Sequence, residues 1–172
     1  MTLVYKFGGS SLVTSSHIRH ASKIILDGWQ DTSSETVLVC VLSALGDTTD
    51  QLYRITEIAS QGPYQTQLSL LFETWNGIIQ ELFPEGYPPL EKEIHLFQQT
   101  LERLGQGIYL LGDVSDKIKN QFVSYGEIVT QSIVYHFLSQ QNEQVGRIDT
   151  RQCIQTHSHF GHTKVYEKIT HQ

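Results

Sequence analysis

The segment Lys6-Phe7-Gly8-Gly9-Ser10-Ser11 combines residue types that can hold a phosphate group: a cation, two hydroxyls and unhindered backbone N–H groups. It follows the apolar run Leu3-Val4-Tyr5 and precedes a stretch with helical spacing. Glycine lets the backbone approach an anion closely, and the next helix adds the positive end of its dipole. We therefore predict a strand that ends in a phosphate-binding turn. The alternative is an ordinary strand-to-helix turn with a solvated lysine.

Ser43 and Thr49 belong to a second segment of this kind, SALGDTTDQL at residues 43–52, which follows another apolar run. A hydroxyl beside the free N–H groups at a helix start can hold a carboxylate without a full positive charge. Thr48 with Gln51 three residues later has the form of a capping box. We expect Thr48 to cap the helix, which leaves Thr49 available to a substrate. In the alternative, both threonines only cap the helix.

Glu127 lies in a third segment, Ser124-Tyr125-Gly126-Glu127, which opens a later helical run. A carboxylate that faces an anionic phosphate site is useful there only if it binds a cation. The alternative is an exposed acid in a first helical turn, where it interacts favourably with the helix dipole. We interpret Ser124 and Gly126 as residues that set the local geometry around Glu127.

The elements that position these segments follow from the hydrophobic pattern. Short apolar runs at residues 3–7 and 37–42 are typical of strands buried on both faces of a parallel sheet. Apolar residues at helical spacing lie between the runs, up to Gly28, which predicts a βαβ unit. A third strand is predicted at 145–148. The expected fold class is α/β, with three layers and a mainly parallel sheet between helices.

The middle of the chain is helical in pattern. Four stretches with apolar residues at helical spacing cover residues 48–62, 68–82, 94–105 and 122–137. Prolines at 84, 88 and 89 end the second stretch, and Gly105 ends the third. We expect the second and third helices to pack as a hairpin, and we expect Gly126 to interrupt the fourth.

Composition indicates a globular protein of one domain. The chain has 172 residues, of which 39% are hydrophobic and 17% charged. A net charge of −6 with scattered Lys and Arg gives no basic field for nucleic acid, so we expect no nucleic-acid partner. The apolar runs are too short to span a bilayer, and the first residues have no basic region followed by an apolar segment. We expect a cytoplasmic protein without a membrane association.

Cysteines and histidines offer little evidence for a metal site. Cys40 and Cys153 have neither the number nor the spacing of a disulfide framework or a zinc site, and we expect both to be inert packing residues. His157 and His159 could place two imidazoles on one strand face, with His162 nearby, but no acid or cysteine completes a ligand set. We therefore predict no metal-binding residues in this sequence.

In their order and spacing, the three segments resemble the N-terminal half of the catalytic domain of the aspartokinases, in the amino-acid kinase family. A fourth stretch, Asp149-Thr150-Arg151 with Thr156 and Phe160-Gly161, resembles the segment that follows in that family. The resemblance covers nearly all of residues 1–172. Nothing in the sequence resembles the family's C-terminal half, which carries most of the nucleotide site, or its regulatory domains.

The resemblance implies a role for each candidate residue. Lys6 would be catalytic and would stabilise charge on the transferred phosphoryl group. Glu127 would hold the α-amino group of the substrate, which points to an amino acid as the acceptor. The implied phosphate contacts to ATP are Lys6, Phe7, Gly8, Gly9 and Ser10, and the implied substrate contacts are Ser43, Thr49 and Glu127.

The implied reaction is the transfer of phosphate from ATP, with Mg²⁺, to the β-carboxylate of L-aspartate. A carboxylate acceptor needs no general base, because aspartate's reference pKa of about 3.9 leaves it anionic at neutral pH. Glutamate 5-kinase and acetylglutamate kinase fit this argument equally well, and a non-catalytic amino-acid-binding module is the rival from another class. We expect a homo-oligomer or a chain completed by a C-terminal half, and we expect residues 1–172 alone to be inactive.

Overall fold

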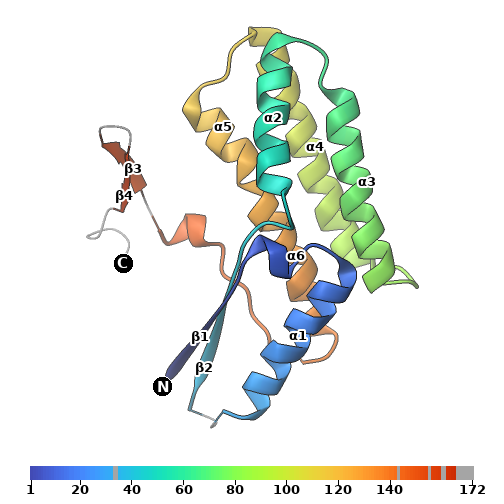
Figure 1. The fold of residues 1–172 in the computed structure, drawn as a ribbon, viewed down its shortest axis with the longest axis vertical. Helices are drawn as coiled ribbons and strands as arrows, with labels where there is room; N and C mark the ends of the chain where they lie inside the picture. The colour runs from blue at the N-terminus through green and yellow to red at the C-terminus, as the bar shows by residue number, and fades with distance from the viewer. Residues whose placement is uncertain (33–34, 143, 155, 160–161, 166–172) are drawn as a thin grey trace.

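The parallel βαβ unit predicted at the N-terminus is present in the structure (Figure 1). The structure is a computed structural model that describes residues 1–32, 35–142, 144–154, 156–159 and 162–165, the last two ranges by their backbone alone. Strand β1 (Thr2–Phe7) pairs in parallel with β2 (Val37–Leu42), from Thr2 opposite Val37 to Phe7 opposite Leu42. The intervening helix α1 (Ser15–Gln30) has the Thr14 hydroxyl as its N-cap, which accepts from the His17 N–H.

A group of helices follows the sheet and lies beyond the carboxyl ends of β1 and β2 (Figure 1). These helices are α2 (Thr48–Gln61), α3 (Gln65–Leu82), α4 (Pro88–Leu111), α5 (Asp116–Val123) and α6 (Tyr125–Ser139). Two 3₁₀ turns, η1 (Gly9–Ser11) and η2 (Thr150–Gln152), and an antiparallel hairpin of β3 (Thr156–His159) and β4 (His162–Val165) complete the described elements. The expected α/β class, with helices and a parallel sheet, is confirmed.

The hydrophobic core is shared by the helices and one face of the sheet. The four helices α3 to α6 each contribute side chains that are almost fully excluded from solvent: Leu71, Trp75, Leu101, Phe122 and Ile133. Tyr5, Phe7, Leu38, Cys40 and Leu42 pack against this core from the strands. Burial of this apolar surface is the main driving force for the fold.

The expectation that both sheet faces are buried is wrong for the described residues. Side chains alternate between exposed and half-buried along both strands. Val4, Val37, Val39 and Val41 are 59%, 60%, 39% and 48% exposed. We call these four residues the valine face. Alternating burial is the signature of a sheet covered on one side only.

Several predicted element boundaries are also corrected. Residues 145–148 form no strand, and α4 continues past Gly105 to Leu111. The fourth helical stretch is two helices, α5 and α6, which meet at Ser124 rather than at Gly126. Helix α4 packs mainly against α2, so the expected hairpin of α3 and α4 is only partly formed.

Candidate substrate site at the carboxyl end of the sheet

The three segments singled out in the sequence meet at one place, where β1 and β2 end. The Ser43 N–H donates to the Phe7 carbonyl at 3.1 Å, so the pairing of the two strands extends one residue past β2. The Gly46 N–H donates to the Gly9 carbonyl, also at 3.1 Å. These two bonds hold the Gly8-Gly9 turn against the loop before α2. Ligands of open parallel sheets bind at this end of the strands.

Gly9 is required by the closeness of that contact. A Cβ atom at Gly9 would lie 2.7 Å from the Gly46 carbonyl oxygen and 2.9 Å from the Ala44 carbonyl oxygen. Both are backbone atoms, so neither can move without displacing the loop. Gly8 differs, because its φ of −79° suits any residue and the nearest atom to a Cβ there is the Lys6 Nζ at 3.5 Å.

Gly126 brings the third segment to the same place. A Cβ at Gly126 would lie 2.9 Å from the Ala44 Cβ and 3.4 Å from the Thr48 Cγ2. The first turn of α6, which contains Glu127, therefore packs directly on the loop between β2 and α2. The turn after β1, the start of α2 and the start of α6 form one continuous surface.

The candidate side chains differ in exposure on this surface. Lys6 and Glu127 are exposed, whereas Ser43 and Thr49 are half-buried. In the phosphate-binding turn, Phe7, Gly8 and Gly9 are half-buried and Ser10 is exposed. All of these residues belong to the three converging segments, and their binding roles remain predictions.

The predicted capping box at Thr48 is wrong. Asp47 is the N-cap of α2, and its side chain accepts from the Gln51 Nε2 at 2.8 Å rather than from the backbone. Thr48 is the first helical residue and is only 4% exposed, because its methyl group packs at Gly126. Thr49 still lies in the first turn of α2, where free N–H groups are found.

Arg151 lies near Tyr125 at the start of α6, although its sequence context predicted no role for it. Its guanidinium pairs with Asp149 at 2.6 Å. The hydrogen bonds that the Arg151 guanidinium donates to the Asp149 carboxylate raise the pKa of Arg151, and Tyr125, two residues before Glu127, contributes in the same direction. The Asp149-Thr150-Arg151 segment is identifiable by resemblance, but only tertiary contacts place its arginine beside the start of α6.

The sequence matches the amino acid kinase family over residues 1–172. This chain belongs to that family. Aspartokinase 1 from Arabidopsis thaliana is 29% identical over 81% of the chain, and lysine-sensitive aspartokinase 3 from Escherichia coli is 24% identical over 92%. The solved structure of E. coli aspartokinase III in complex with aspartate and ADP matches 99% of this chain with a TM-score of 0.82. The two sequences are 22% identical, so this match establishes the fold.

This family member spans a minor part of the length of those relatives. It covers 24% of the Arabidopsis protein, 33% of the E. coli protein and 36% of the solved aspartokinase III chain. The fold and the family are thus shared over the whole of this chain, and the activity of the longer relatives comes to it only as a proposal.

No group of three or more His, Cys, Asp or Glu side chains could hold a metal ion within the described residues. His157, His159 and His162 lie in β3 and β4, but their side chains fall outside the described part.

The two cysteines differ in burial. Cys40 is half-buried, and burial raises the pKa of its thiol. Cys153 is exposed and is therefore not the packing residue we expected. No described helix is both long and apolar enough to cross a membrane.

A network around Glu93 of α4 holds the segment that leads to Arg151. The Arg147 guanidinium lies 2.6 Å from the Glu93 carboxylate and also donates to the Ser132 hydroxyl at 2.9 Å. The His136 Nε2 lies 3.0 Å from the same carboxylate. Burial disfavours the charged form of Glu93, but the hydrogen bonds outweigh it and hold the pKa of this carboxyl below its ordinary value.

This lowered pKa predicts a pH-dependent contribution to stability. Because the folded state holds the charged form, the contribution is present above the ordinary value of 4.5 and is lost as the pH falls through the lowered pKa. Glu93→Gln should lower the free energy of unfolding at pH 7 by about 1.5–3 kcal/mol. The difference between wild type and variant should shrink below pH 4.5. Urea unfolding at several pH values measures it, with the exposed Glu85→Gln as control, and a difference that is constant with pH would refute the argument.

Gly9 and Gly8 provide a matched test of the packing at the site. Gly9→Ala should destabilise the chain by about 1–3 kcal/mol, because the new methyl group overlaps two carbonyl oxygens of the facing loop. Gly8→Ala should change stability by less than about 0.5 kcal/mol, since its Cβ has ordinary contacts. Urea unfolding of both variants decides the point. Equal effects at the two glycines would mean that the turn does not pack on the loop as described.

Proposed function

We propose that this chain is the N-terminal, amino-acid-binding part of an aspartate kinase, which phosphorylates the β-carboxylate of L-aspartate with ATP to give 4-phospho-L-aspartate. That reaction is the first step of lysine, threonine and methionine biosynthesis. The observation that carries the proposal is the convergence of three segments through Gly9 and Gly126, and these are the segments that contain Lys6, Thr49 and Glu127.

Each side chain has a role that its chemistry allows. Lys6 would stabilise negative charge on the transferred phosphoryl group, while Gly8, Gly9 and Ser10 present backbone N–H groups and a hydroxyl to phosphate oxygens. Ser43 and Thr49 would contact the substrate, Thr49 with a hydroxyl in the first turn of α2. Glu127 would bind the α-ammonium group. The acceptor carboxylate is already anionic at neutral pH and needs no base.

The nucleotide would be bound as Mg-ATP. Since the described residues offer no carboxylate cluster, the metal ion would be held chiefly by the phosphates, with this chain contributing the cation and N–H groups of the turn. The solved aspartokinase III contains ADP and aspartate, which supports both as ligands of a protein with this fold. A cytoplasmic location remains part of the proposal, as does a homo-oligomer or a chain completed by a C-terminal half.

The nearest rivals are a glutamate 5-kinase, an acetylglutamate kinase and a non-catalytic module. A substrate panel on a protein extended to the length of its relatives separates them, since aspartate should be the only one of the three acceptors with substantial turnover. Phosphorylation of glutamate or acetylglutamate instead would reassign the substrate. A lack of turnover with every acceptor would favour the non-catalytic module.

Glu127→Gln tests the assignment of the amino-group partner in that extended protein. The change keeps the shape but removes the charge, so KM for aspartate should rise about tenfold or more while KM for ATP stays nearly constant. A hydrogen bond to a charged group is worth about 1.5–3 kcal/mol, or one to two decades in affinity.

The control for Glu127→Gln is Asp116→Asn, which neutralises another exposed acid in a first helical turn, that of α5. If Glu127 acts only on the helix dipole, the two variants should affect stability alike and leave both KM values unchanged. An equal rise in KM for aspartate and ATP would show that Glu127 is structural.

A further inference from the structure

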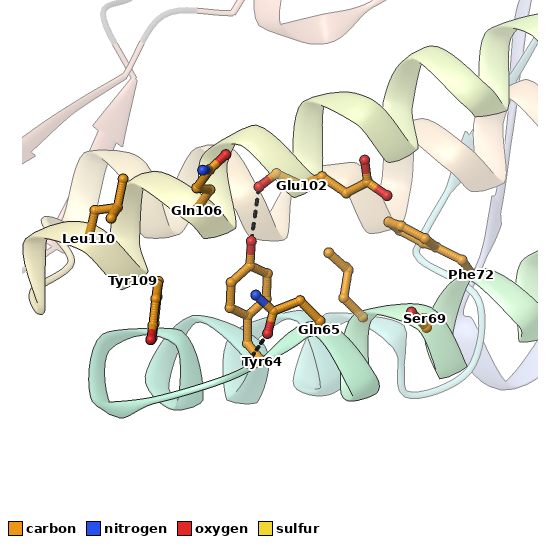
Figure 2. A pocket seen from close by; sticks show the side chains of 9 residues that line it. Tyr64, Gln65, Ser69, Phe72, Glu102, Gln106, Tyr109 and Leu110 are labelled. Atoms are coloured by element: carbon orange, nitrogen blue, oxygen red, sulfur yellow. Dashed lines mark hydrogen bonds between the residues drawn. The ribbon is translucent and has the colours of Figure 1, made fainter.

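A groove of about 500 Å³ lies between α3 and α4, away from the candidate substrate site. Figure 2 shows its two walls. One wall is formed by Tyr64, the residue before α3, with Gln65, Ser69 and Phe72 of the first half of α3, and the other by Glu102, Gln106, Tyr109 and Leu110 of the second half of α4. The groove exists because α4 packs mainly on α2 and leaves the α3 side partly open. Its volume is in the range of small-molecule sites.

Tyr64 forms the floor of this groove and is held in place by two features. Its hydroxyl donates to the Glu102 carbonyl at 3.0 Å, and the side chain is only 3% exposed. Gly105 makes room for the ring, since a Cβ there would overlap the Tyr64 side chain. Because Tyr64 is bonded to α4 and almost fully buried, it shapes the groove, and the 45% exposed Tyr109 is the tyrosine whose ring a ligand can contact.

The charge of the groove is negative. Glu102 is the one charged side chain among its nine lining residues. Burial raises the pKa of the Tyr64 phenol, and the negative charge of Glu102 raises it further. Figure 2 shows the Glu102 carboxylate at the end of the groove near Phe72, with Tyr109 and Leu110 at the opposite end.

The rest of the lining is aromatic or neutral. The rings of Tyr64 and Tyr109 are 6.5 Å apart at an angle of 48°, and Leu110 is 74% exposed at the rim. Aromatic faces attract cations as well as apolar groups. A carboxylate at one end, with aromatic, aliphatic and neutral polar side chains along the remainder, matches a molecule with a positive head and an apolar body.

We propose that the groove between α3 and α4 binds a small organic ammonium compound, with its cationic head at Glu102 and Phe72 and its apolar body along the groove toward the exposed ring of Tyr109. This site is separate from the surface formed by Lys6, Thr49 and Glu127, and it does not depend on the proposed kinase function. An anion is excluded by the charge of Glu102, and a neutral compound of the same shape gains only the apolar contacts.

The experiment uses 2-phenylethylammonium as the cationic probe, 2-phenylethanol as the neutral probe and 3-phenylpropanoate as the anionic probe. Each is titrated into the ¹⁵N-labelled chain and followed by amide chemical shifts. The cation should bind at millimolar concentration, about 5- to 30-fold more tightly than the alcohol, with the largest shifts at Gln65, Ser69 and Gln106. The anion should bind most weakly.

Two variants separate the two ends of the site. Glu102→Gln keeps the backbone carbonyl that accepts from Tyr64, so the fold should persist while the preference for the cation over the alcohol disappears. Tyr109→Ala should weaken both compounds by a similar factor and leave the preference intact. Glu73→Gln removes an exposed charge of α3 outside the groove lining and should change neither value.

The remaining outcomes overturn the proposal. Equal binding of cation and alcohol to the unaltered chain, retention of the preference in Glu102→Gln, or shifts located away from α3 and α4 would each do so. Binding of the probe only after dilution would show that a second copy of the chain occupies the groove instead.

Discussion

Lys6→Ala, made in a protein extended to the length of its relatives, should lower the proposed aspartate kinase kcat by about 10²–10³ and change KM for aspartate little. A charge aimed at the transferred phosphoryl group acts mostly in the transition state, where negative charge on that group is greatest. The Lys6 Nζ lies above Gly8, at the turn that faces the loop before α2, which is where a phosphate would be held. Steady-state kinetics with saturating Mg-ATP measures the effect.

The control for Lys6→Ala is Lys23→Ala, which removes another exposed cation, on α1. That change should leave kcat within a factor of two. Because Lys6 is exposed on the side of the sheet away from the core, its loss should not alter folding, and circular dichroism checks this. A Lys6→Ala variant that keeps more than a third of the wild-type kcat would rule out a role in charge stabilisation.

The βαβ unit was predictable because local signals agree there. The apolar runs of β1 and β2, the helical spacing of α1 and the glycines of the turn all lie within the first 46 residues and support the same fold. The exposed valine face was missed, since a continuous apolar run carries no information about which face is covered. Val4 and Val39 have the same residue type as buried strand positions in other sheets.

Long-range contacts decided what the sequence pattern could not. Residues 145–148 have a strand-like composition, yet Arg147 is tied to Glu93 and Ser132, and the Ile148 carbonyl accepts from the Gln131 side chain at 2.8 Å. These side-chain contacts lay the segment along α6 and take the place of strand pairing. No local pattern encodes a partner on a helix about fifty residues earlier.

Two glycines were interpreted as helix breaks, and both are instead sites of close packing. Gly105 lies inside α4 beneath the Tyr64 ring, and Gly126 lies in the first turn of α6 against Ala44. A glycine inside a helix lowers helix stability by about 1 kcal/mol relative to alanine. Glycine in a helical pattern can therefore mark either the end of a helix or a close packing contact within it. The contact of Gly126 with Ala44, which brings the third segment to the candidate site, could not be inferred from the sequence around Gly126 alone.

Residues 1–172 alone are expected to show no measurable aspartate kinase activity. In the proposed function, the three converging segments would supply an amino-acid contact and only one side of a phosphate site, whereas the relatives are about three times as long or longer. Positioning supplies much of the rate enhancement in phosphoryl transfer, so an incomplete site loses rate out of proportion to the contacts removed.

The valine face gives a physical reason to expect that further chain is needed. Its four residues are between 39% and 60% exposed, and the two described strands of this sheet each have an unpaired edge. Exposed apolar faces and open strand edges favour association with other chains. The isolated chain should therefore self-associate. A separately expressed C-terminal portion, chosen to complete the length of the relatives, should reduce that association and restore some turnover.

A coupled ADP-release assay on the purified chain, with saturating aspartate and Mg-ATP, tests the expected inactivity, and analytical ultracentrifugation measures the self-association. Val39→Lys with Val41→Lys should reduce self-association without restoring activity, because both side chains point away from the core. The Lys6→Ala form of the same chain controls for contaminating kinases. Turnover by residues 1–172 that disappears in this control would show that the surface at the end of β1 and β2 is a complete active site.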